Sequence, residues 1–239
     1  MKKLIEGAGR LGIKLSAGQV KQFERYYQEL IEWNNKFNLT SITDYHQVQI
    51  KHFLDSLTVV LALTNKELSQ PNLSIIDIGT GAGFPGVPLK IFLGKPRLVV
   101  IESIAKKATF LRHLVSELEL EGTEVVPGRA EEIAHSLLYR EQFGLAVSRA
   151  VALLPSLVEL ALPFCQVGGK FVAQKKGDIS QEIALANRAI ANLGGKLGQI
   201  KPITLEELGD RRYLVILDKI YPTPEKYPRR PGLVKRRPI

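Results

Sequence analysis

One glycine-rich turn, at residues 75–85, constrains the fold of this chain more than any other feature. A short β-prone run leads into three glycines at alternating positions, and Pro85 then begins an amphipathic run. Glycine accepts positive φ angles and lets a ligand approach the backbone, whereas proline suits the first turn of a helix. The pattern predicts a strand, a tight turn and a helix, with exposed N–H groups at the helix start that favour a negatively charged or polar ligand group. The glycines are Gly79, Gly81 and Gly83.

The spacing of these glycines separates the turn from a dinucleotide-binding loop. It is G-x-G-x-G rather than G-x-G-x-x-G, and Asp77 stands just before the first glycine. The next expected strand, 97–101, ends in Glu102, about 20 residues past the glycines, where an acid can accept hydrogen bonds from a ribose diol. This combination is similar to the S-adenosylmethionine loop of Rossmann-like methyltransferases. A βαβ turn with incidental glycines is the alternative.

Composition limits the remaining possibilities. The chain has 239 residues, 45% of them hydrophobic, which is enough for one sizeable core and an appendage. No apolar run reaches the ~18 residues of a membrane-spanning helix. Cys165 is the one cysteine, so an internal disulfide is excluded and a cytoplasmic location is expected. The histidines and this cysteine have no metal-ligand spacing, so no metal is expected. The net charge of +9 suggests a polyanionic partner, although solubility alone can account for it.

Two helical patterns precede the glycine turn, and we expect residues 1–72 to form a helical segment packed on the core. Apolar residues recur at helical spacing over 19–37. A second helix is expected from about Asp44 to Leu63, with Asp44 and Gln47 resembling a capping box. This helix carries His52-Phe53-Leu54-Asp55-Ser56, whose polar groups, on spacing alone, fit a solvated helix face with one capped histidine.

Alternating β and α patterns follow from residue 73 and predict an α/β core over 73–220, with a parallel sheet covered by helices on both faces. Ser103 is the expected N-cap of a helix that Gly122 ends. The strand at 124–126 should deliver residues 127–132 to the rim where the glycine turn lies, because ligands collect at the carboxyl ends of such strands. The expected strands are 75–78, 97–101, 124–126, 145–150, 170–174 and 214–217, and later helices are expected at about 153–164 and 178–193.

The C-terminal segment, 221–239, is rich in proline and in lysine and arginine, with Glu225 as its one acid. Proline and like charge disfavour packing, so we expect either a disordered solvated tail or a phosphate-binding arm. In both cases the tail should be separate from the cofactor pocket, and its removal should leave cofactor affinity unchanged.

Several motifs occur together in a fixed order and resemble the glucose-inhibited division protein B family, the bacterial guanine-N7 methyltransferases of small-subunit ribosomal RNA. The resemblance spans roughly 19–239, and the glycine stretch with its trailing Phe-Pro-Gly is its most specific part. Two stretches depart from the family pattern: Lys175-Lys176-Gly177, where one lysine is usual, and Gly232-Leu233-Val234 in the tail. The motifs are Asn38-Leu39-Thr40, His52-Phe53-Leu54-Asp55-Ser56, Asp77 to Gly86, Arg129-Ala130-Glu131-Glu132, Ser148-Arg149-Ala150, Lys175 before a glycine, and Tyr227-Pro228-Arg229.

The resemblance implies a class I methyltransferase with a mostly parallel seven-stranded sheet, S-adenosylmethionine as cofactor, and small-subunit ribosomal RNA, free or in a ribosomal particle, as substrate. Guanine N7 carries an in-plane lone pair at neutral pH, so we assign no general base and expect catalysis by alignment. The implied cofactor-binding residues are Gly79, Gly81, Gly83, Phe84, Glu102, Ser103, Ile104, Ala130, Glu131 and Arg149. The RNA-binding candidates are Asn38, His52, Lys175, Arg229, Arg230, Lys235, Arg236 and Arg237.

Two other classes stay open at this point, and we expect a monomer in each case. One is a methyltransferase that acts on a small molecule or a protein, which a neutral tail would have favoured. The other is a non-catalytic RNA-binding protein on the same scaffold. The intact Asp77, the three glycines and Glu102 argue against the latter. A nicotinamide-dependent oxidoreductase is disfavoured by the glycine spacing.

Overall fold

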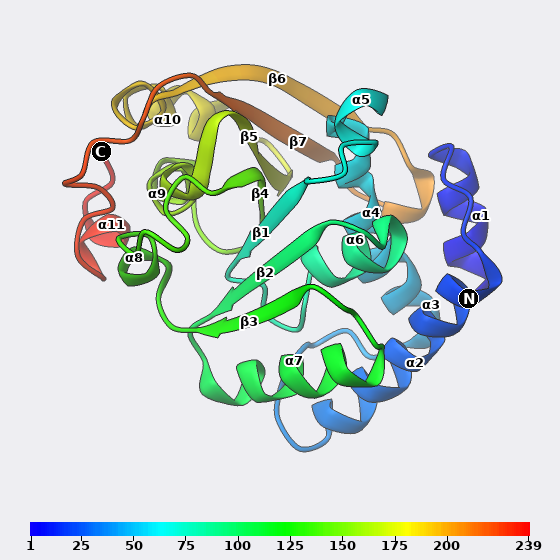
Figure 1. Ribbon diagram of the computed structural model, residues 1–239. Helices are drawn as coiled ribbons and strands as arrows, with labels where there is room; N and C mark the ends of the chain where they lie inside the picture. Colours follow the sequence, from blue (N-terminus) through cyan, green and yellow to red (C-terminus); the bar gives the residue numbers. More distant parts are fainter.

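The computed structural model describes residues 1–239, which fold around a single seven-stranded sheet (Figure 1). The strand order is β3-β2-β1-β4-β5-β7-β6, and β7 is antiparallel to both of its neighbours. The mostly parallel sheet predicted from the sequence is therefore confirmed. The strands are β1 (Ser74–Ile78), β2 (Arg97–Glu102), β3 (Thr123–Pro127), β4 (Phe143–Arg149), β5 (Cys165–Lys176), β6 (Gly195–Ile203) and β7 (Arg212–Lys219).

Helices cover both faces of the sheet because successive strand residues point to opposite sides. Leu98 and Val100 of β2 join one core, with α6, α7 and the N-terminal helices, whereas Val99 and Ile101 join a second core with α8, α9 and α10. The helices, including short 3-10 and π turns, are α1 (Lys2–Arg10), α2 (Ala17–Asn34), α3 (Tyr45–Val48), η1 (Gln49–Leu54), α4 (Asp55–Leu57), η2 (Thr58–Ala62), α5 (Asn65–Leu68), α6 (Gly86–Leu93), α7 (Ala105–Glu117), α8 (Ala130–Ile133), α9 (Leu154–Ala161), η3 (Leu162–Phe164), α10 (Ser180–Asn192), η4 (Glu206–Leu208) and α11 (Leu233–Arg236).

The sequence patterns located six of the seven strands. β6, an edge strand, was not located because Gly195, Gly198 and Pro202 weaken its β pattern and most of its side chains are exposed. One helix boundary was also wrong: α7 begins after Ile104, without a side-chain cap from Ser103, and ends at Glu117 rather than near Gly122.

The N-terminal helices support the glycine turn directly. Tyr26 of α2 donates a hydrogen bond to the carbonyl of Ala82 (2.6 Å), and its ring stacks on Phe84 with centroids 5.3 Å apart. The second expected helix is present but changes type along its length, since a π turn at Gln49–Leu54 interrupts it. This turn carries His52 toward the sheet, where the residue is buried. The division into 1–72, 73–220 and 221–239 stays a prediction.

The C-terminal segment packs against the sheet's second face, contrary to expectation. Arg229 pairs with the fully buried Glu159 of α9, and Val234 of α11 is 1% exposed. Arg140 donates to the carbonyls of Thr223, Pro224 and Tyr227. The prediction of an unpacked tail failed because its partners lie far away in the sequence. Glu159 neutralises the charge of Arg229, and Arg140 binds backbone carbonyls of the tail, and local composition shows neither contact. Figure 1 shows α11 beside α8 and α9. No helix has the length and apolarity needed to cross a membrane.

Candidate active site at the carboxyl ends of β1, β2 and β4

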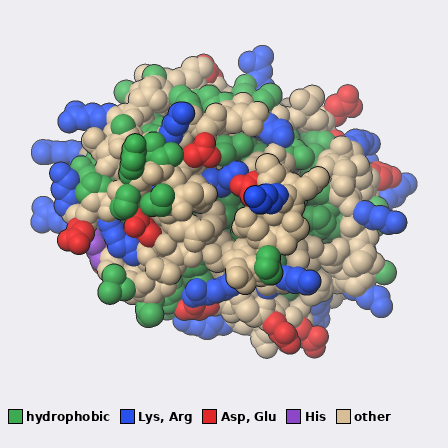
Figure 2. All heavy atoms as spheres, turned by 45° about the horizontal axis from the view of Figure 1, so that its top comes forward, with side chains coloured by type: hydrophobic (Ala, Val, Ile, Leu, Met, Phe, Trp, Pro, Cys, Tyr) green, Lys and Arg blue, Asp and Glu red, His purple; other side chains and the backbone are tan.

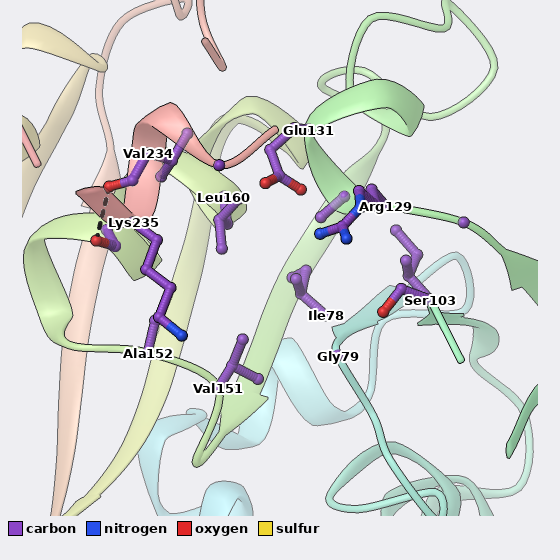
Figure 3. A pocket seen from close by; sticks show the side chains of 15 residues that line it. Ile78, Gly79, Ser103, Arg129, Glu131, Val151, Ala152, Leu160, Val234 and Lys235 are labelled. Atoms are coloured by element: carbon purple, nitrogen blue, oxygen red, sulfur yellow. Dashed lines mark hydrogen bonds between the residues drawn. The ribbon is translucent and has the colours of Figure 1, made fainter. Parts of the chain in front are cut away.

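The carboxyl ends of the central strands open into two neighbouring cavities, one on each side of Gly79. The strand order reverses between β1 and β4, where open α/β sheets form their ligand crevice. The first cavity, about 210 Å³, is lined by Ile78, Gly79, Ile101, Ser103, Gly128, Arg129, Ala130, Glu131, Val151, Ala152, Ser156, Leu160, Gly232, Val234 and Lys235 (Figure 3). The second, about 340 Å³, is lined by Leu39, Thr40, His52, Gly79, Thr80, Gly81, Ala82, Phe84, Glu102, Ile104, Lys107, Arg149, Ala150 and Val151.

Val151 and Gly79 belong to both cavities. A Cβ atom at Gly79 would lie 2.7 Å from a methyl carbon of Val151, and Gly79 has a φ of +67°. Only glycine therefore fits between β1 and the turn that follows β4. An elongated ligand can reach from one cavity to the other across this position.

Asp77 fixes the glycine loop through hydrogen bonds on the side of the loop that faces away from the cavities. Its Oδ2 accepts hydrogen bonds from the Thr80 hydroxyl (2.6 Å) and the Gly86 N–H (2.7 Å), whereas Oδ1 has no partner. Because the carboxyl group is fully buried, its pKa is raised from the ordinary 3.8 to about 7, although both hydrogen bonds oppose this shift. Asp77 thus holds the turn and does not contact the cavities.

The N–H groups of the glycine loop are mostly occupied, which corrects the expectation of an open anion site. Those of Gly79 and Thr80 donate to the carbonyl of Ile101, and that of Gly81 donates to Glu102. Gly83 and Phe84 donate to the carbonyl of Thr80. Ala82 keeps the one N–H group between residues 79 and 84 that has no partner. A ligand anion at this end needs cations, and Lys107 and Arg149 line the same cavity.

Glu102 is positioned to bind a diol. Its Oε2 accepts the Gly81 N–H at 2.9 Å, and its Oε1 accepts the Ile104 N–H at 2.8 Å. Each carboxylate oxygen can accept a further hydrogen bond, so both remain available to a pair of ribose hydroxyls. The side chain is buried, and its fixed orientation comes from β2 and from the loop that it binds.

Arg149 joins the second cavity to the N-terminal segment. Its guanidinium donates to the carbonyl of Lys51 and to Oδ2 of Asp55, both at 3.0 Å. It also lies over the ring of Phe84, 5.0 Å from the centroid, and His52 stacks on the same ring at 4.5 Å. His52 from the N-terminal helical segment and Arg149 from β4, both predicted as site residues, therefore meet at Phe84.

His52 is held as a neutral ring with a defined tautomer. Arg149 can only donate, so Nδ1 of His52 accepts its N–H (3.3 Å) and the proton is on Nε2. Nε2 then donates to the Thr40 hydroxyl at 2.9 Å. Burial, and then the charge of Arg149, lower the pKa of His52 from 6.5 to about 3. Thr40 also accepts the Ile42 N–H, which leaves its own hydroxyl proton for a ligand in the second cavity.

The structure divides the predicted cofactor residues between the two cavities. Gly79 lines both, Ser103, Ala130 and Glu131 line the first, and Gly81, Phe84, Glu102, Ile104 and Arg149 line the second. Gly83 lines neither and packs under the loop.

The RNA-binding candidates are dispersed. His52 lines the second cavity and Lys235 the first, while Asn38 is exposed beside Leu39. Lys175 donates to the carbonyl of Ala152 and pairs with Glu182, so it supports the turn after β4, whereas its neighbour Lys176 is exposed. Arg229 is committed to Glu159, and Arg230, Arg236 and Arg237 are exposed.

Sequence reasoning missed Val151, Ser156 and Glu159 as site or anchor residues, and it placed Thr40 in a family motif without assigning it a role. Glu159 left a signal, since it is an acid inside an otherwise apolar helical run. Val151 and Ser156 left no signal, because small and apolar residues acquire such a role only from the segments that pack against them. No cluster of histidine, cysteine and acidic residues could hold a metal ion.

A mostly parallel sheet with β7 inserted antiparallel, a glycine turn after β1 and an acid at the end of β2 define a class I S-adenosylmethionine-dependent methyltransferase. The model of one such family, rRNA small subunit methyltransferase G (GidB), matches residues 19–211, and the chain belongs to this family. It is 46% identical over 239 residues to "Ribosomal RNA small subunit methyltransferase G" of Dehalococcoides mccartyi strain CBDB1, covering 100% of both chains. It is 47% identical over 234 residues to the protein of the same name from Pelotomaculum thermopropionicum, covering 98% of this chain and 96% of that protein.

Solved structures share the fold at low sequence identity. A "SAM dependent methyltransferase from Aquifex aeolicus" superposes with a TM-score of 0.52 and 15% identity, covering 74% of this chain and 94% of the other. The structure of "M. jannaschii TYW2 in complex with AdoMet" gives a TM-score of 0.50 and 14% identity, with 64% and 72% covered. These structures confirm the predicted fold class. Membership of the methyltransferase family confirms the predicted enzyme class and its cofactor.

Proposed function

We propose that this protein transfers the methyl group of S-adenosylmethionine to N7 of a guanine in small-subunit ribosomal RNA. The observation that carries the proposal is the pair of cavities joined at Gly79, in a chain that belongs to a ribosomal RNA methyltransferase family. The first cavity suits the adenine of the cofactor, and the second, which Glu102 lines, can receive the ribose, the methionine end and a flat base.

The polar groups in and between the cavities fit S-adenosylmethionine. Glu102 offers two acceptor oxygens for the ribose diol, while Ser103 and Glu131 line the first cavity without hydrogen-bond partners of their own. Arg149 and Lys107 supply positive charge for the methionine carboxylate. When bound, S-adenosylmethionine supplies an electrophilic methyl group on its sulfonium centre.

The residues around the second cavity then orient the base. Guanine N7 needs no deprotonation, so its lone pair forms the new N–C bond while the C–S bond breaks and its electron pair stays on sulfur. Phe84 and the neutral His52, stacked on each other, form an apolar wall of the cavity, and the free Thr40 proton provides a donor for an acceptor on the purine edge. The enzyme's contribution is alignment, which in favourable systems lowers a barrier by up to about 7–11 kcal/mol.

The distribution of charge supports an RNA substrate. Lysine and arginine side chains are spread over both sides of the face in Figure 2, with fewer acids among them. Phosphate contacts from such a surface position RNA without reading its sequence. In this proposal the protein acts as a cytoplasmic monomer, and either free RNA or an assembled particle presents the guanine.

Methyl-group transfer to purified small-subunit ribosomal RNA, and separately to small ribosomal particles, tests the proposal. Substrates from a strain that lacks this protein should gain N7-methylguanosine at a single position. Arg149→Lys keeps the charge but loses the two-pronged geometry, so it should slow transfer at least tenfold, by about 1.4 kcal/mol. Lys66→Arg, a change at an exposed helix residue away from both cavities, is the control.

Methyl transfer to another base or to protein would refute the substrate assignment. So would the absence of transfer to both forms of the RNA. Absence of binding to S-adenosylhomocysteine in calorimetry would refute the cofactor site itself.

A further inference from the structure

The wall of the first cavity opposite the glycine turn is made by the C-terminal segment. Gly232, Val234 and Lys235 line the same space as Ser103 and Glu131. Figure 3 shows Val234 and Lys235 on one side of this space and Glu131, Arg129 and Ser103 on the other, with Leu160 between them. The tail therefore forms part of this cavity, whereas the sequence predicted a tail separate from the cofactor pocket.

A buried ion pair holds the segment in this place. Arg229 donates from Nε to Oε1 (2.9 Å) and from Nη2 to Oε2 (2.6 Å) of Glu159, and its backbone N–H donates to Oε1 at 2.7 Å. Such a bidentate pair with an additional backbone bond fixes both position and orientation. The Ser156 hydroxyl also donates to the carbonyl of Val234 at 2.9 Å, the dashed line in Figure 3.

The cavity presents polar groups that have no partner within the protein. The ammonium of Lys235, the guanidinium of Arg129 and the carboxylate of Glu131 take part in none of the hydrogen bonds or ion pairs of the structure. Ile78, Val151 and Leu160 supply apolar surface between them. A flat heterocycle with donors on one edge and acceptor nitrogens on another complements this lining.

We propose that the C-terminal segment completes the adenosine part of the cofactor site and that Lys235 is a cofactor-binding residue. Its ammonium donates to acceptor atoms of the adenosine, while the carboxylate of Glu131 accepts from the opposite side. The inference rests on the proposed placement of the adenine in the first cavity. The positive tail thereby has a role beyond phosphate contact.

Titration of the full-length protein with S-adenosylhomocysteine tests the role of Lys235. Lys235→Ala should weaken binding about tenfold, the size of one lost hydrogen bond from a charged donor. Arg236→Ala, at the adjacent exposed cation that does not line the cavity, should change affinity less than about twofold. Equal affinity in the Lys235→Ala variant and the parent overturns the proposal. Failure of the parent to bind refutes the proposed function instead.

Hydrogen exchange provides a second measurement that requires no substitution. The amides of Arg236 and Arg237 donate to the carbonyls of Gly232 and Leu233, so their exchange reports how firmly α11 is docked. S-adenosylhomocysteine should slow the exchange of these amides together with that of Gly81. Protection of Gly81 without protection of residues 232–237 would show that the cofactor binds without the tail, and would overturn the proposal.

Discussion

Arg149 donates a hydrogen bond to Nδ1 of His52 across 3.3 Å and thereby determines which nitrogen of that ring carries the proton. The direction of each later bond follows from this one. Nε2 of His52 must donate to Thr40, and Thr40, which also accepts from Ile42, must direct its own proton elsewhere. These bonds, from Arg149 through His52 to Thr40, leave the neutral hydroxyl of Thr40 as a free donor at the second cavity.

Thr40→Val is expected to lower kcat/KM for methyl transfer about tenfold, because the valine has the same shape but no hydroxyl proton. Thr40→Ser keeps the hydroxyl and should retain most of the activity. S-adenosylhomocysteine affinity should be similar in both variants, since Thr40 lines the second cavity and not the first, where we place the adenine. Parental kcat/KM in the valine variant would contradict this role.

Asp55→Asn should slow methyl transfer by releasing Arg149. Asp55 is nearly buried and its Oδ2 accepts from both Arg149 and Arg212, so its neutralisation leaves two cations without their shared partner. Removing one member of a buried pair costs up to about 3–5 kcal/mol of folding stability. Urea denaturation and transfer kinetics measure the two effects. Asp210→Asn, at a half-exposed partner of Arg212, is the matched control and should leave both quantities nearly unchanged.

Asp77 should make folding stability fall as the pH rises. Its pKa is about 7 in the folded protein and near 3.8 when unfolded, so the folded state binds the proton more tightly. The stabilisation is complete below about pH 4 and is lost as the pH rises toward about 7. Asp77→Asn stays neutral throughout, so its stability relative to the parent should improve between about pH 4 and pH 8. A pH-independent difference in urea denaturation would refute this account.

Arg229→Ala should destabilise the protein by about 3 kcal/mol, because Glu159 would remain fully buried without its partner. Arg230→Ala, at the exposed neighbour, should change stability by less than about 0.5 kcal/mol. Thermal or urea unfolding distinguishes the two. If both variants match the parent, the tail is not anchored by this pair.

Much of the fold followed from local sequence. The strand, turn and helix around Gly79, the acid at the end of β2, and the position of His52 on the second helix are set by residues close in sequence, whose φ preferences and apolar spacing act over a few residues. The sheet class, the cofactor and the family followed from these patterns. Edge strand β6 did not, because an exposed strand with glycines carries little periodic signal.

The sequence alone determined that this chain builds a cofactor-binding α/β core, but only the tertiary structure decided how its charged groups are used. Arg229 pairs with Glu159, 70 positions away, and so the basic tail becomes a wall of the first cavity rather than a solvated appendage. Lys175 pairs with Glu182, and Arg149 is oriented at the second cavity by Asp55 and His52. The physical reason is that a charge acts according to its burial and its partners, and both are fixed by contacts between segments remote in sequence.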